Sequence, residues 1–133
     1  MRFRNALFLI AVISLAVILL AILLNPNSSA RTGTGAKYNV DITSTGFSPR
    51  ILNIKIGDTV IFTNKDTDRH WVASDIHPTH NVYPEKGGCI GSKFDVCREM
   101  SKGESYEFTF FSKGSWCYHD HLHPQLTGCV DAQ

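Results

Sequence analysis

The sequence lacks several features that mark a nucleic-acid-binding protein or a large enzyme. From residue 37 onward, 10 lysine and arginine residues are set against 12 aspartate and glutamate residues, a balance of −2. Nucleic-acid-binding domains are usually strongly basic, so nucleic acid is not an expected partner. The 133 residues are also too few for a TIM barrel or a two-domain enzyme. No Ser/His/Asp order, phosphate-binding glycine loop or pair of catalytic carboxylates is present, and we therefore predict that the chain is not an enzyme.

Long apolar runs are absent except near the N-terminus, where 19 residues, 6–24, carry no charge. As a helix this run would be about 28 Å long, close to the roughly 30 Å hydrocarbon core of a bilayer. Arg2 and Arg4 precede it and the next basic residue is Arg31, so the positive-inside rule places the remainder outside the cytoplasm. We predict that residues 1–24 are a signal-anchor. The alternative is a signal peptide cleaved after Ala30, which would release a secreted protein.

After a Ser-, Gly- and Thr-rich linker at residues 25–36, the sequence lacks any convincing amphipathic helix. Residues 37–133 instead contain short β-type runs separated by turn residues. The expected strands cover residues 38–42, 51–56, 59–64, 70–73, 105–110 and 115–119, and a last one begins at 128–130. Short strands at this density are typical of a sandwich or a small barrel. The long irregular stretch 74–103 is the kind of segment that often carries function.

Four cysteines lie in the last third of the chain and allow three pairings. Cys89 and Cys97 bracket part of the long stretch, and Cys117 and Cys129 lie on the last two expected strands. We predict disulfides Cys89–Cys97 and Cys117–Cys129, which would persist outside the cytoplasm. The alternative leaves Cys117 as a free thiolate that binds a metal ion.

Six histidines fall between residues 70 and 123, and three of them lie within five residues. Imidazole is the commonest protein ligand for copper, zinc, iron and nickel. Loops that are distant in sequence can meet at one end of a sandwich, so this pattern predicts a metal site. For His77 and His80 a solvated surface position is an equal alternative. Trp71 and the other strand aromatics are expected in or near the core. The acidic residues expected to be solvated are Asp41, Asp66, Asp68 and Glu85.

Two blocks of the sequence resemble the cupredoxin family. Residues 57–64, followed by Asp66 and His70, resemble its "GDtVtfxNxD…H" block. Residues 118–130 resemble its closing "Y-x-C-x-x-H-P-x-M-x-G-x-V" block. The resemblance implies an all-β, Greek-key β-sandwich of cupredoxin type with a metal site at one end, preceded here by the N-terminal membrane or signal helix.

The chain departs from the family pattern at two ligand positions. His70 and His123 match the two histidine ligands, but Asp120 stands in place of the cysteine and Leu126 in place of the methionine. A blue copper centre depends on its thiolate, so this alignment predicts a different site. The predicted metal ligands are His70, Asp120, His121 and His123, with His77, His80 and His119 as secondary candidates. Such nitrogen and oxygen donors suit copper, and zinc would compete.

Strand alternation supports this register, because Tyr118 and Asp120 share one face while Cys117 and His119 point to the other. If Cys117 were the ligand instead, the aromatic residues of this strand would face water.

The favoured function is a membrane-tethered copper-binding protein outside the cytoplasm, serving copper delivery or electron transfer with a redox or copper-accepting partner protein. One alternative is a metal-free, degenerate cupredoxin that acts as a disulfide-stapled interaction module. Another is a blue copper electron carrier that uses Cys117. A copper enzyme with an open site ranks last, because no substrate pocket or second cofactor is evident.

Overall fold

The computed structural model describes residues 35–133. The predicted membrane segment, and all but the end of the predicted linker, lie outside the described residues. Within residues 35–133, no helix is long and apolar enough to cross a bilayer.

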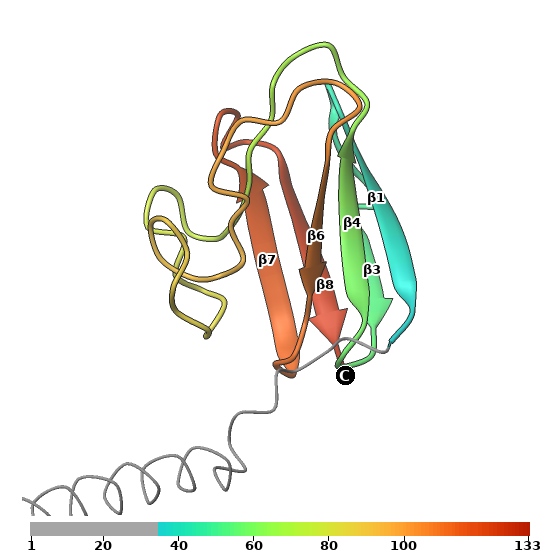
Figure 1. The fold of residues 1–133 in the computed structure, drawn as a ribbon, viewed down its shortest axis with the longest axis vertical. Helices are drawn as coiled ribbons and strands as arrows, with labels where there is room; N and C mark the ends of the chain where they lie inside the picture. Colours follow the sequence, from blue (N-terminus) through green and yellow to red (C-terminus); the bar gives the residue numbers. More distant parts are fainter. Residues whose placement is uncertain (1–34) are drawn as a thin grey trace, which may run out of the picture. The chain divides into compact units, whose positions relative to one another are not determined.

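The described chain forms two four-stranded β-sheets that pack face to face (Figure 1). The strands are β1 (Lys37–Thr43), β2 (Gly46–Ser48), β3 (Ile51–Ile54), β4 (Thr59–Asn64), β5 (Val72–Ser74), β6 (Ser105–Thr109), β7 (Gly114–Asp120) and β8 (Thr127–Ala132). One sheet has the order β2-β1-β4-β6 and the other β3-β8-β7-β5. Neighbouring strands are antiparallel except for the parallel pairs β1–β4 and β3–β8. The predicted all-β sandwich is confirmed.

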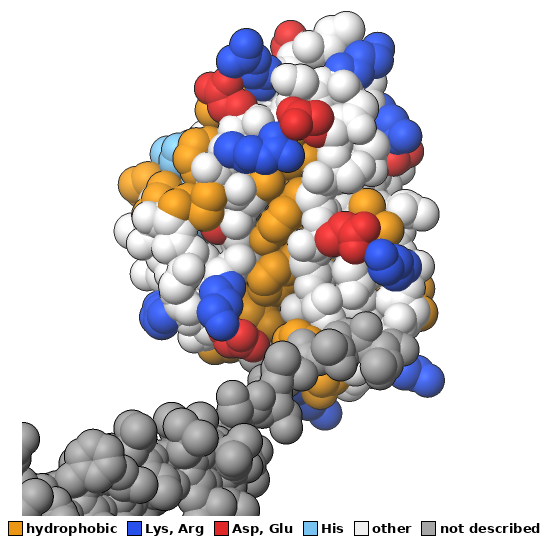
Figure 2. Space-filling model, viewed as in Figure 1, with side chains coloured by type: hydrophobic (Ala, Val, Ile, Leu, Met, Phe, Trp, Pro, Cys, Tyr) orange, Lys and Arg blue, Asp and Glu red, His pale blue; other side chains and the backbone are white. Residues whose placement is uncertain are grey.

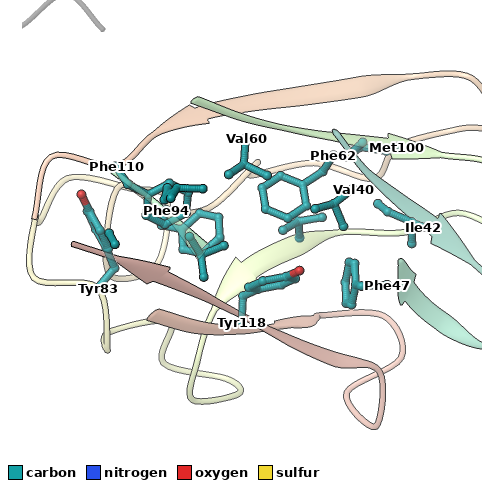
Figure 3. Close-up of a cluster of buried hydrophobic side chains, with 14 residues drawn as sticks. Val40, Ile42, Phe47, Val60, Phe62, Tyr83, Phe94, Met100, Phe110 and Tyr118 are labelled. Atoms are coloured by element: carbon teal, nitrogen blue, oxygen red, sulfur yellow. The ribbon is translucent and has the colours of Figure 1, made fainter. Parts of the chain in front are cut away.

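The core lies between the sheets and is rich in aromatic rings (Figure 3). Val60 and Phe62 alternate with partly exposed residues along β4, so one face of this strand is apolar. Phe62 is fully buried, and its ring lies 5.1 Å from that of Tyr118 on the opposite sheet. Edge-to-face contacts of this kind fix the spacing of the two sheets. Outside the core, charged side chains of both signs are mixed on the face seen in Figure 2.

Two local expectations differ from the structure. Residues 46–48 lie in none of the expected strands, but they form β2, an edge strand paired with the end of β1. Gly46 adopts a φ of 131°, which only glycine reaches readily and which lets the chain reverse directly after β1. Trp71 does not belong to the core cluster, although the other predicted aromatics of the strands do.

The long segment between β5 and β6 contributes to the core instead of projecting into solvent. Tyr83, Phe94 and Met100 are fully buried. Residues 94–96 run beside β5, because Ser74 N donates to Phe94 O and Val96 N donates to Val72 O. In Figure 1 this segment, coloured yellow-green to orange, lies beside β7. It therefore covers the end of a sheet face that would otherwise be open to water.

Two disulfides reinforce this part of the fold. Cys89–Cys97 closes a loop within the long segment, and Cys117–Cys129 joins directly opposite residues of β7 and β8. Gly91 lets the segment fold tightly, because a Cβ atom there would overlap the carbonyl oxygens of Thr79 and His80.

Replacing Phe62 tests the aromatic core. Phe62→Ala removes a fully buried ring, so we expect it to lower the free energy of unfolding by about 3–5 kcal/mol. Ile51→Ala is the matched control, because Ile51 is 61% exposed and its loss should cost no more than about 0.5 kcal/mol. Urea denaturation of both variants measures the difference. Equal losses would mean that the core does not depend on Phe62.

Candidate metal centres

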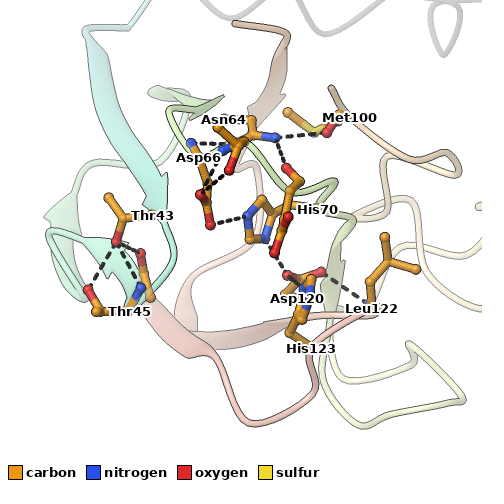
Figure 4. A network of polar contacts seen from close by, with 12 residues as sticks. Thr43, Thr45, Asn64, Asp66, His70, Met100, Asp120, Leu122 and His123 are labelled. Carbon is orange, nitrogen blue, oxygen red and sulfur yellow. Dashed lines mark hydrogen bonds and ion pairs between the residues drawn. The ribbon is translucent and has the colours of Figure 1, made fainter. Parts of the chain in front are cut away.

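A first group of polar side chains lies at the end of β7 and consists of His70, Asp120 and His123, here named the Asp120 cluster (Figure 4). Asp120 is the last residue of β7, His70 precedes β5, and His123 lies in the loop before β8. One potential ligand atom from each lies within 4.8 Å of the others. His70 and Asp120 are buried, whereas the side chain of His123 is 34% exposed. The cluster is thus open to solvent at one edge.

The Asp120 carboxylate is the centre of this cluster. Its Oδ2 atom lies 2.6 Å from His70 Nδ1 and 2.7 Å from His123 Nδ1. Its Oδ1 atom accepts the backbone N–H of Trp71 at 2.9 Å and of Leu122 at 3.1 Å. Burial alone would raise the pKa of Asp120, but the hydrogen bonds outweigh it and leave the pKa below its usual value. An ionised carboxylate only accepts hydrogen bonds, so both Nδ1 atoms donate to Oδ2.

A second carboxylate lies on the other side of His70. Asp66 Oδ2 is 3.4 Å from His70 Nε2, too long for a good hydrogen bond but close enough for an ion pair. Asn64, at the end of β4, accepts the Asp66 N–H at 2.8 Å and so holds this turn in place. The Asp66 side chain is only 15% exposed, so the expectation that it is solvated is wrong.

A second group contains His80, His119 and His121, here named the three-histidine cluster. One ring nitrogen from each lies within 4.8 Å of the others. His119 lies on the face of β7 opposite to Tyr118, as alternation predicts, yet it is only 1% exposed. The long segment covers this face and brings His80 to it, with His80 Nε2 2.9 Å from His121 Nδ1.

Two carboxylates orient the imidazoles of the three-histidine cluster. His80 Nδ1 lies 2.6 Å from Asp95 Oδ2, and His119 Nδ1 lies 2.9 Å from Asp75 Oδ1. Each Nδ1 is thereby occupied, and Nε2 is the ring nitrogen left for another partner. Asp95 is itself held, because its Oδ1 accepts the Trp71 indole N–H at 2.6 Å.

The surroundings of His119 and His121 favour their neutral imidazole forms. Burial lowers the pKa of His119, and this outweighs the opposing effect of Asp75. Burial also lowers the pKa of His121, with a further decrease from the neighbouring His80 and His77. Neutral imidazoles keep the lone pair that a metal ion requires.

Trp71 connects the two clusters. Its backbone N–H donates to Asp120, and its indole N–H donates to Asp95. Its ring centroid lies 4.7 Å from that of His121. Trp71 therefore lies between the two groups of histidines and positions a carboxylate of each.

The structure divides the predicted ligands between the two clusters. His70, Asp120 and His123 are brought together, but His121 lies with the secondary candidates His80 and His119. His77 is exposed and outside both sets, although its ring centroid is 4.8 Å from that of His121.

Sequence reasoning missed Asp75 and Asp95. Asp95 lies between Phe94, which is buried in the core, and Val96, which packs against it, so an apolar–polar–apolar alternation was the available signal. A third group of possible metal ligands contains Cys89, Asp95 and Cys97. It offers no thiolate, because the two cysteines form a disulfide.

Comparisons of sequence and of structure both relate this chain to copper proteins of the cupredoxin type. Amicyanin from Paracoccus denitrificans is 30% identical over 106 residues, which cover 80% of this chain and 72% of amicyanin. A solved structure of an amicyanin mutant in its oxidized state is 27% identical with a TM-score of 0.59, and covers 74% of this chain and 83% of that one. A purple cupredoxin from Nitrosopumilus maritimus is 22% identical with a TM-score of 0.58, over 71% of this chain and 98% of that one, which shows the fold. No protein-family model matches the chain.

The same fold also occurs in an enzyme. A Cu-containing nitrite reductase from Thermus scotoductus SA-01 matches 73% of this chain with a TM-score of 0.57 and 24% identity, although the match spans only 22% of the enzyme chain. The prediction that this chain is not an enzyme is therefore corrected, because neither the fold nor the missing catalytic motifs exclude catalysis. The likeness shows the fold alone and does not establish an activity.

The fold supports a copper-binding or electron-transfer role, and the amicyanin and cupredoxin relatives imply copper as the cofactor. Amicyanin matches most of both sequences, and the two-sheet sandwich places His70 and His123 together at one end. This chain belongs to the cupredoxin family.

Proposed function

We propose that this cupredoxin binds copper outside the cytoplasm at the Asp120 cluster, for copper delivery or electron transfer. The observation that carries the proposal is the position of one buried carboxylate oxygen, Asp120 Oδ2, against two imidazole Nδ1 atoms. Because the carboxylate is ionised, it supplies the negative charge that a copper ion requires of a buried site.

The residues present fit a copper site without a thiolate. Asp120 occupies the position of the family's cysteine, and Cys117 is joined to Cys129, so neither provides a sulfur ligand. This argues against the alternative of a blue copper carrier that uses Cys117. Two imidazoles and one carboxylate remain, a set that suits Cu(II).

Each residue of the cluster has a role in this proposal. Copper, when bound, supplies a one-electron redox couple and a positive charge. His70 and His123 would hold it through Nδ1, each with its ring proton on Nε2 instead of Nδ1, and Asp120 would hold it through Oδ2. Trp71 and Leu122 hold the carboxylate in place through their backbone N–H groups. The partly exposed His123 and the neighbouring Leu122, which is 37% exposed, form the edge that a redox or copper-accepting partner would approach.

Membrane tethering forms the second part of the proposal. It rests on the uncharged residues 6–24 and on the basic residues Arg2 and Arg4 before them. Two disulfides in the described residues favour an oxidising compartment for the domain.

Replacing the carboxylate tests the copper site. Asp120→Asn removes the negative charge and places a competing N–H donor among the imidazoles, so we expect Cu(II) uptake to fall by one equivalent per chain. Asp68→Asn is the matched control, because Asp68 is exposed and outside the cluster. Metal analysis after desalting measures the uptake. Unchanged uptake in Asp120→Asn would refute the proposed site.

Restoring the family's thiolate provides a gain-of-signal test. Asp120→Cys places sulfur between the two Nδ1 atoms, so we expect an intense visible charge-transfer band on addition of Cu(II), where the natural protein gives a weak, pale one. Ser115→Cys is the control, because it adds an exposed thiol on the same strand. Absorption spectra of the three proteins, recorded with Cu(II), show whether the intense band appears only in Asp120→Cys. An intense band in the natural protein would mean that a thiolate already binds copper.

Cell fractionation tests the tether. We expect the full chain to stay in the membrane fraction after an alkaline carbonate wash, because an apolar span of this length inserts stably. A chain that starts at residue 31, exported by an unrelated cleavable signal, should be soluble. If the natural chain is also recovered in the soluble fraction, residues 1–30 act as a cleaved signal peptide.

A further inference from the structure

Internal hydrogen bonds satisfy only part of the three-histidine cluster. His80 Nε2 is paired with His121 Nδ1 at 2.9 Å. Among residues 35–133, however, the buried His119 Nε2 has no hydrogen-bond partner, whereas buried polar groups are normally paired. Leaving such a group unsatisfied costs about 1–3 kcal/mol, which a bound ligand would recover.

The carboxylates around the cluster have the positions that metal-binding histidines require. A histidine that binds a metal through one nitrogen typically donates its other N–H to a carboxylate, which fixes the tautomer and the orientation of the ring. Asp95 does this for His80, and Asp75 does it for His119. His119 Nε2 is therefore left as a free lone-pair donor. The lone pair of His80 Nε2 faces His121 Nδ1, and the His80 and His119 ring centroids are 5.0 Å apart.

The backbone at His80 is held in an uncommon conformation. Its φ of 47° lies in the left-handed region, which residues other than glycine rarely adopt. Ser92 N donates to His80 O at 2.7 Å, and Gly91 packs against the same carbonyl group. Strain of this kind is retained where the surrounding structure holds a functional side chain in place.

From these observations we propose that His80, His119 and His121 form a second transition-metal site, separate from the Asp120 cluster, with copper as the preferred ion. Three imidazole ligands suit both copper and zinc, and among divalent ions copper binds nitrogen sites most tightly. The two clusters share no residue, so this second site does not depend on copper binding at the Asp120 cluster.

Adjacent residues of the chain serve the two sites. Asp120 and His121 are neighbours in sequence, and the Trp71 carbonyl oxygen accepts the His121 N–H at 2.7 Å. His121 is only partly buried, which gives an ion a route to the otherwise covered His80 and His119. The exposed His77 stacks at this opening without belonging to the ligand set.

Metal stoichiometry tests the proposal. The full chain, purified in mild detergent without a histidine tag and stripped with a chelator, is titrated with Cu(II), and bound copper is counted after desalting. We expect two equivalents for the natural chain, one for His121→Ala, one for His123→Ala and none for the double variant. His77→Ala is the matched control and should bind two. Circular dichroism and thermal melting verify that each variant is folded.

A conservative variant separates loss of metal binding from loss of folding. Asp95→Asn keeps the size of the side chain but weakens the orientation of His80, so we expect the copper affinity of this site to fall about 10- to 100-fold. The nitrogen hyperfine pattern of the Cu(II) EPR spectrum provides a second readout, and in His123→Ala it should be that of a site with imidazole donors only.

The outcomes separate this proposal from the proposed function. One equivalent in the natural chain that is lost in His121→Ala and kept in His123→Ala would uphold the three-histidine site and refute copper at the Asp120 cluster. The reverse pattern would overturn the three-histidine site. Equal uptake by His121→Ala, Asp95→Asn and the natural chain, with unchanged affinities, would also overturn it.

Discussion

The buried negative charge of Asp120 is the constraint on which this end of the molecule depends. A carboxylate that is fully removed from water is tolerated only when its oxygens are hydrogen-bonded. Four donors meet this requirement: two imidazoles and the backbone N–H groups of Trp71 and Leu122. Because these donors come from the approach to β5 and from the loop before β8, the charge ties both segments to the end of β7. It thereby shapes the end of the sandwich at which His70 and His123 lie together.

The segment between β5 and β6 provides the second constraint. It has little regular structure, yet it places Tyr83 and Phe94 in the core and runs along β5 by backbone hydrogen bonds. Since it covers the outer face of the sheet beside β7, a strand residue such as His119 that points away from the core becomes buried as well. Burial on both faces of one strand end is what allows two groups of imidazoles to form side by side. Trp71 separates them and donates a hydrogen bond to a carboxylate of each.

The two clusters offer different chemistry to a metal ion. In the Asp120 cluster two imidazoles share one carboxylate oxygen, so a carboxylate faces the centre and brings a negative charge to it. In the three-histidine cluster, Asp75 and Asp95 bind the far side of the imidazoles, and only nitrogen faces the centre. A site with an anionic ligand favours Cu(II) through charge attraction. A site of neutral nitrogen ligands loses less electrostatic stabilisation when Cu(II) is reduced to Cu(I). Asp120, which aligns with the family's cysteine in the sequence resemblance, therefore gives this end of the fold a different donor set from that of a thiolate site.

The sandwich, and the meeting of His70, Asp120 and His123 at one end of it, could be predicted from the sequence. Alternating residues defined the strands, and two blocks at family spacing assigned His70, Asp120 and His123 to one end, because that spacing follows from the same strand–loop geometry. The folded structure was needed to show that His121 belongs to a different group and that Asp75 and Asp95 orient two imidazoles. It was also needed to show that Trp71 lies outside the core. Alternation fixes which face of a strand a residue takes. It does not reveal what covers that face, and here the covering segment is held by contacts between residues far apart in the sequence.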